Sequence, residues 1–249
     1  MCMNLNLIML SGAVLLSPDK VKPTMRVRPE DGMSIHRFYL KIGKDTPPII
    51  CKSYGKLAKR AEALCTSVNG GAVHLLCQGR LETTEYGSKN YLTEFVLSDI
   101  YPAAADQNVN LFLAAGRAVR DGEFFIGSGE KKALWSGRMA VNRQISHGNT
   151  KTEYISVKAF DKKAEFATNW LPKGTPFFAK GVLSIGTYTD KNNVQQLSYD
   201  LLAFDIGFTS DKGAGQRNIP QSQPQASQAS TGTDGFASGF NSGWGDLPL

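Results

Sequence analysis

The second half of the chain alternates apolar and polar residues in runs that predict β-strands. These runs cover residues 111–113, 135–141, 154–160, 176–185 and 196–208. One run, 162–170, has the spacing of a short helix and is closed by Leu171-Pro172-Lys173-Gly174. About five strands with one helix between the third and the fourth is the order of an OB-fold, a small Greek-key barrel.

Short blocks of the first half recur in the second half at nearly constant spacing. Residues 6–12 resemble 110–116, residues 54–58 resemble 160–164, and residues 78–81 resemble 180–183. Such spacing indicates a duplicated unit of about one hundred residues. We therefore predict an all-β chain with one short helix per unit, built as two tandem OB-fold Greek-key barrels over residues 1–105 and 106–209.

The alternation stops after residue 209, where Gly, Ser, Gln, Pro, Asn and Thr dominate. Such a segment buries too little apolar surface to offset its ordering entropy, so residues 210–249 are predicted to form a disordered C-terminal tail. The sequence Gly-Trp-Gly-Asp-Leu-Pro-Leu at 243–249 is either a stray hydrophobic stretch or a recognition peptide on a flexible tether. We favour the peptide. Its candidate partner-binding residues are Trp244, Asp246, Leu247, Pro248 and Leu249.

Charge adds a weak indication of a polyanionic partner. The chain has 28 Lys+Arg against 22 Asp+Glu, and its net charge of +6 divides into +4, +3 and −1 over the two units and the tail. No apolar run is long enough to span a bilayer. The apolar stretch 7–16 has no preceding Lys or Arg, and a related stretch recurs in mid-chain, so we expect a cytoplasmic protein rather than a secreted one.

The cysteines do not have the spacing of a metal site or a disulfide framework. Cys2, Cys51, Cys65 and Cys77 form no C-x-x-C pair. A site combining Cys65, His74 and Cys77 can be drawn, but a buried reduced thiol in the strand-like run 73–77 is the better interpretation of Cys77. Clustered carboxylates and a shared histidine motif are also missing from the sequence, so neither an enzyme nor a cofactor is expected.

A period of two places Tyr154, Lys158 and Phe160 on one face of the predicted strand 154–160, opposite its aliphatic residues. One interpretation is a cross-strand aromatic pair half covered by a loop. The other is a platform on which bases stack while a cation contacts phosphate. The further candidates on the neighbouring strand and the last hairpin are Arg138, Arg143 and Tyr188.

The first unit has a similar outer face with fewer aromatic residues. Its candidates are Tyr39, Lys52, Tyr54 and Tyr86. Pro47 and Pro48 stand where the second unit has Glu153 and Tyr154. A proline has no backbone N–H to donate to a neighbouring strand, so these prolines shorten the strand. We therefore expect weaker nucleic-acid binding from the first unit. It could serve dimerisation instead.

The ordered set of these motifs resembles the bacterial single-stranded DNA-binding protein family. The residues that carry the resemblance are 152–165, 171–174, 54–58 and 79–81, together with an Asn and a Gly in the first strand of each unit. The aromatic residues of the family's third strand match Tyr154, Phe160 and Tyr54, and its hairpin aromatic matches Tyr188 and Tyr86. The family's chains end in Asp-Ile-Pro-Phe, where this chain has Asp-Leu-Pro-Leu.

The resemblance implies sequence-independent binding of single-stranded DNA in replication, recombination and repair, in the nucleoid of the cytoplasm. It also implies recruitment of replication and repair enzymes through the C-terminal tip, and a homodimer that presents four OB-folds. Two alternatives stay open at this point. The chain could be an interaction hub for which DNA is secondary, or an RNA-binding OB protein, because stacking rings do not read a 2′-hydroxyl.

Overall fold

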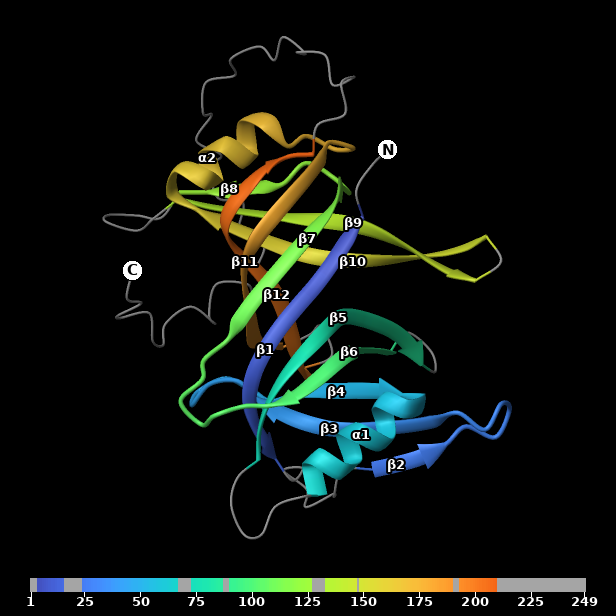
Figure 1. Ribbon diagram of the computed structural model, residues 1–249. Coiled ribbons are helices and arrows are strands. Elements are labelled where there is room, and N and C mark those ends of the chain that lie inside the picture. The colour runs from blue at the N-terminus through green and yellow to red at the C-terminus, as the bar shows by residue number, and fades with distance from the viewer. Residues whose placement is uncertain are drawn as a thin grey trace.

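The computed structural model describes residues 4–15, 24–66, 73–86, 90–126, 133–146, 148–189 and 193–209 (Figure 1). These residues form the same order of strands and helix twice. The first half contains β1 (Leu5–Leu15), β2 (Thr24–Val27), β3 (Ser34–Lys41), β4 (Ile49–Tyr54), α1 (Gly55–Thr66), β5 (His74–Tyr86) and β6 (Asn90–Pro102). The second half contains β7 (Asn110–Ala118), β8 (Glu123–Phe125), β9 (Leu134–Ser146), β10 (Asn149–Phe160), α2 (Asp161–Trp170), β11 (Pro176–Thr189) and β12 (Gln195–Phe208). The predicted tail, 210–249, lies outside the described residues.

Each half closes its strands into a barrel. In the first half β1 pairs with both β3 and β5, and the ladder is completed through β4 and β6, which run parallel at Cys51↔Phe95. In the second half β7, β9, β10, β12 and β11 follow one another in the same way, with β10 and β12 parallel. This is the strand order of an OB-fold, so the predicted fold class is confirmed. The short strands β2 and β8, of four and three residues, were not predicted because so few residues show no clear alternation.

The duplicated sequence blocks occupy equivalent places in the two barrels. The Asn6 amide donates from Nδ2 to the carbonyl of Leu81 at 2.8 Å and accepts the Leu81 N–H at 3.3 Å. Asn110 makes the same two hydrogen bonds with Leu183, at 2.9 and 2.8 Å. One asparagine in each half therefore ties the first strand of its barrel to the strand that follows the helix, and this role accounts for the repeated asparagine.

Strands β1 and β7 join the two barrels in one antiparallel ladder. In its register Ile8 lies opposite Phe112, and a residue on β1 therefore faces the part of β7 that duplicates it. An approximate two-fold axis passes through this pair. The ladder makes a single twelve-stranded sheet of the described strands. The boundary between residues 105 and 106 stays a prediction, because the sheet runs across both units.

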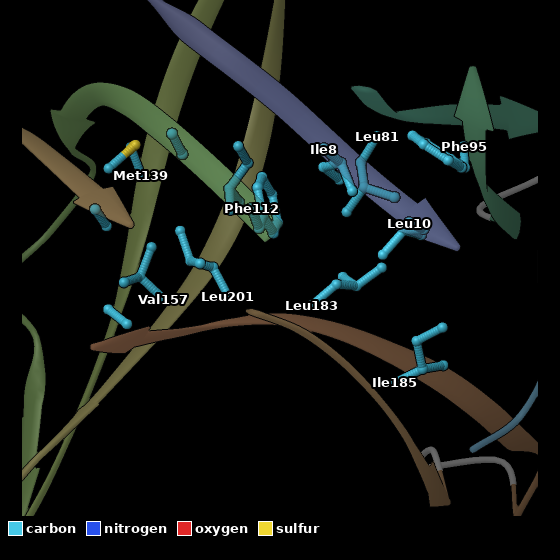
Figure 2. Packing of buried hydrophobic residues seen from close by; sticks show 14 of the residues in the cluster. Ile8, Leu10, Leu81, Phe95, Phe112, Met139, Val157, Leu183, Ile185 and Leu201 are labelled. Atoms are coloured by element: carbon cyan, nitrogen blue, oxygen red, sulfur yellow. The ribbon is translucent and has the colours of Figure 1, made fainter. Parts of the chain in front are cut away.

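The hydrophobic core also crosses from one barrel to the other (Figure 2). Ile8 and Phe112 are fully buried within one cluster that reaches Phe95 in the first barrel and Met139 in the second. Trp135 is buried as well. Among the described residues, no helix has the length and apolar content that a membrane crossing requires.

Candidate nucleic-acid interface

Strand β10 sorts its side chains onto two faces, as the period of two predicts. Ile155, Val157 and Ala159 are buried in the barrel, whereas Tyr154 is exposed, and Ser156, Lys158 and Phe160 are half-buried on the outside. The Tyr154 residue keeps 55% of its surface exposed. The backbone at Tyr154 is paired with Ala140 of β9, so the ring projects from a paired strand and is open to a planar partner.

Arg138 completes this face from the neighbouring strand. It lies opposite Ser156 in the β9–β10 ladder, so the two side chains share the outer face. Its guanidinium carbon lies 5.8 Å from the centre of the Tyr154 ring, within the range of a cation–π interaction. Both residues are exposed. The structure thus brings together an aromatic ring and a cation on one solvent-facing surface.

Tyr188 lies near the end of the β11–β12 hairpin, opposite Gln196, with 44% of its surface exposed. The hairpin is anchored further down by Ile185 and Tyr199, which pack against the shared core. Burial, with the Cys51 thiol of the first barrel nearby, raises the pKa of Tyr199 to about 12. This packing fixes the base of the hairpin that carries Tyr188.

Lys158 is engaged in an ion pair. Its Nζ lies 2.8 Å from Oδ2 of Asp200 on the parallel strand β12, and both side chains are largely buried. Lys52 repeats this arrangement in the first barrel, with its Nζ 2.8 Å from Oε2 of Glu94. Both lysines predicted to contact phosphate therefore already neutralise a carboxylate within the barrel.

On the outer face of the first barrel, one buried carboxylate, Glu94, binds two cations. Arg37 also binds Glu94, at 2.6 Å, and Lys52 lies 5.4 Å from the centre of the Tyr54 ring. Burial opposes the charge of Glu94, but hydrogen bonds from Arg37 and Lys52 outweigh it and lower the pKa of the carboxyl. Arg37 and Lys52 are thus both occupied by the buried carboxylate between them.

The aromatic candidates of the first barrel are less available than Tyr154. Tyr39 and Tyr54 are half-buried, and Tyr86 ends β5 with its side chain outside the described residues. Strand β4 has six residues where β10 has twelve, as Pro47 and Pro48 predict.

Arg143 lies apart from the other candidates. It is five residues from Arg138 on β9, so its side chain leaves the opposite face of the strand. There it binds Glu82 of the first barrel at 2.9 Å, next to Lys151, whose Nζ lies 2.8 Å from Glu153. Glu153 in turn accepts the backbone N–H of Thr83 at 3.0 Å. Arg143 therefore belongs to a polar contact between the two barrels, and the odd spacing from Arg138 was the signal in the sequence.

Two residues on the outside of the second barrel were missed by the sequence pattern. Phe204 on β12 is half exposed, and Nζ of Lys180 on β11 lies 5.7 Å from the centre of its ring. Phe204 follows the buried Ala203, and Lys180 lies between the buried Ala179 and Gly181, so the alternation itself directs both outward. The β11–β12 ladder has a bulge at Phe204, which shifts the alternation of the residues that follow it.

The described residues contain no group of three or more His, Cys, Asp and Glu arranged to hold a metal ion. Cys51 and Cys77 are buried free thiols, in agreement with the favoured interpretation of Cys77. Burial also raises the pKa of the Cys65 thiol to about 12. The proposed partner-binding residues of the tail, 244–249, lie outside the described residues.

Comparisons with known proteins identify relatives of this chain. Residues 109–209 match the model of the single-strand binding protein family. A single-stranded DNA-binding protein of Clostridium perfringens is 24% identical over 135 residues, which are 54% of this chain and 79% of that protein.

Two solved structures share the fold over most of the chain. One is a deletion mutant of the single-stranded DNA-binding protein of Thermus aquaticus, with a TM-score of 0.64 and 19% identity, covering 86% of this chain and 98% of that one. The other is the wild-type Thermus aquaticus protein, with a TM-score of 0.63 and 18% identity, covering 84% of this chain and 94% of that one. These findings confirm the resemblance predicted from the sequence.

Proposed function

From these matches, which support a bacterial member of the single-strand binding protein family, we propose that this chain binds single-stranded DNA without reading its base sequence. The observation that carries the proposal is the exposed Tyr154 ring with Arg138 beside it, on the outer face of the barrel that the family model matches. No bond is made or broken in this function, so the chain acts as a binding protein and not as an enzyme.

The physical basis of binding is stacking combined with phosphate contacts. Every base has a π-face, so Tyr154, Phe160 and Tyr188 accept any base, and each stack contributes about 1–3 kcal/mol. Arg138 supplies a positive charge beside Tyr154 for the backbone of the strand. Lys158 orders the face through Asp200 and adds a second contact when a phosphate competes for it. The first barrel contributes less, because Arg37 and Lys52 are both bound to Glu94.

A homodimer that presents four barrels is the second part of the proposal. The outer side of the β1–β7 ladder carries half-buried apolar side chains, among them Leu7, Met9, Leu111 and Leu113. An apolar groove of about 410 Å³ adjoins them, lined by Leu5, Leu113 and Phe178 among others. These apolar side chains around the approximate two-fold axis would suit a symmetric contact with a second copy of the chain.

The dimer is tested by light scattering. We expect a mass about twice the 27.1 kDa of one chain. Leu113→Glu is expected to give a monomer because it buries a charge in the contact. Val27→Glu, on the exposed strand β2, is the matched control and should stay dimeric. A monomeric unaltered chain, or a folded Leu113→Glu variant that stays dimeric, would contradict this arrangement.

The cellular role follows from the binding mode. We infer that the protein covers single-stranded DNA in the nucleoid of the cytoplasm during replication, recombination and repair. Residues Trp244, Asp246, Leu247, Pro248 and Leu249 would recruit enzymes of these processes. The resemblance of the Asp-Leu-Pro-Leu tip to the family's tip supports this role.

One experiment tests binding and recruitment together. Tryptophan and tyrosine fluorescence of the full chain and of residues 1–209 is titrated with poly-dT at low and high salt. We expect both proteins to bind, with affinity falling as salt rises because phosphate contacts release counterions. Only the full chain should retain replication and repair enzymes in a pull-down. Failure to bind poly-dT, or tighter binding of poly-rU, would overturn the DNA assignment; equal pull-down by residues 1–209 would overturn recruitment by the tip.

A further inference from the structure

The β11–β12 ladder contains a bulge at an outward-facing phenylalanine of the second barrel. Lys180 pairs with Asp205 and Gly181 pairs with Ala203, so Phe204 is the extra residue between two paired positions. Half of the Phe204 surface is exposed, and Nζ of Lys180 lies 5.7 Å from the centre of its ring. An aromatic ring and a cation thus stand together on the outside of the barrel, as Tyr154 and Arg138 do.

The first barrel provides an internal comparison for this bulge. Its β5–β6 ladder shifts register at the equivalent point, where Gln78 pairs with Asp99 and Gly79 pairs with Leu97. The extra residue there is Ser98, whose hydroxyl donates to the carbonyl of Gln78 at 3.2 Å. A small polar residue therefore satisfies the backbone geometry of the bulge. The bulge itself therefore does not require a phenylalanine at this place.

The register of β10 and β12 places Phe204 at the end of the aromatic face. Ala159 lies beside Ala203 in this parallel pair, and both are buried. The next residues along the two strands, Phe160 and Phe204, therefore both leave the barrel on its outer side, just past the end of this paired segment. Tyr154, Phe160 and Phe204 thus all lie on the outer face of two neighbouring strands.

We propose that Phe204 and Lys180 form a further binding position for single-stranded DNA, which accepts one base on the ring and the adjoining phosphate on the lysine. This inference rests on the function proposed above and extends the path of the strand past Phe160. Asp205 is the cross-strand partner of Lys180 and is exposed, so the lysine offsets a negative charge next to this position. A DNA strand is favoured over a protein partner because the position adds a ring to this outer face and repeats the ring–cation pair at Tyr154.

The test replaces Phe204 with the residue that the first barrel uses at this place. Phe204→Ser is expected to weaken binding of a long oligo-dT by about five- to 150-fold, the effect of losing one stacked base. Oligomers too short to reach past Phe160 should bind as before. Phe125→Ser, at a similarly exposed phenylalanine on β8, is the matched control and should not change the affinity. Phe204→Trp should keep the affinity, and its fluorescence should be quenched by oligo-dT.

A parallel titration of Tyr154→Ala separates this inference from the function on which it rests. If Tyr154→Ala weakens binding while folded Phe204→Ser binds long oligomers like the unaltered chain, the position at Phe204 is refuted and DNA binding stands. An equal loss for short and long oligomers would also refute it, since that pattern reports a general disturbance of the face. If the unaltered chain does not bind oligo-dT, both proposals fall together.

Discussion

Replacing Tyr154, Phe160 and Tyr188 together with alanine is expected to weaken poly-dT binding by several kcal/mol in sum. Each base that loses its aromatic partner forfeits about 1–3 kcal/mol of stacking. The loss should be large at the second barrel, because Tyr154 is the ring beside the exposed Arg138, and Phe160 and Tyr188 are the other two aromatic candidates of this barrel. Fluorescence titration at a fixed salt concentration measures the effect, since the salt-dependent phosphate contacts remain in the variant.

Two matched variants identify the cause of that loss. Tyr154→Phe keeps the ring and should bind nearly as well as the unaltered chain. Tyr39→Ala combined with Tyr54→Ala should cost less than the triple variant, because both tyrosines are half-buried in a face whose cations are bound to Glu94. A loss below about tenfold for the triple variant would refute the assignment of the binding face.

The alternation of single strands predicted the part of this face that depends on local sequence. The period of two along 154–160 separates Tyr154 and Phe160 from the buried Val157 without any knowledge of the neighbouring strands. Placing Arg138 on the same face needed only one antiparallel register. Such features follow from the backbone geometry of one strand or one hairpin.

Features that join distant strands were not predictable in the same way. Lys158 meets Asp200 because β10 and β12 run parallel, and the two residues are 42 positions apart in the chain. Phe204 lies beside Lys180 because it is the extra residue of a bulge in the pairing of β11 with β12, which the sequence does not show. Each of these contacts depends on the register of strands whose order the sequence predicts but whose exact pairing it does not.

The pairing of β1 with β7 is the largest feature of this kind. The repeat indicated two barrels, but the sequence did not indicate that their first strands form one ladder around Ile8 and Phe112. This ladder and the shared core make the stability of either barrel depend on the other. Cooperative unfolding of both halves is therefore the thermodynamic expectation.

Phe112→Ala is expected to lower the free energy of unfolding by about 3–5 kcal/mol, because the lost ring leaves a cavity in a fully packed core. Phe112 is fully buried at the two-fold axis, in the cluster that spans both barrels. Urea unfolding followed by far-UV circular dichroism and by tryptophan fluorescence should show one shifted transition with both probes.

A phenylalanine outside the core provides the control for this variant. Phe125→Ala, at a residue with 51% of its surface exposed, should change the free energy of unfolding by no more than about 0.5 kcal/mol. Trp135 and Trp170 report only on the second barrel, whereas circular dichroism reports on both. Two separate transitions, with only the one seen by tryptophan fluorescence shifted in Phe112→Ala, would mean that the barrels unfold independently. A single shifted transition would instead mean that the β1–β7 ladder makes one cooperative unit of the duplicated chain.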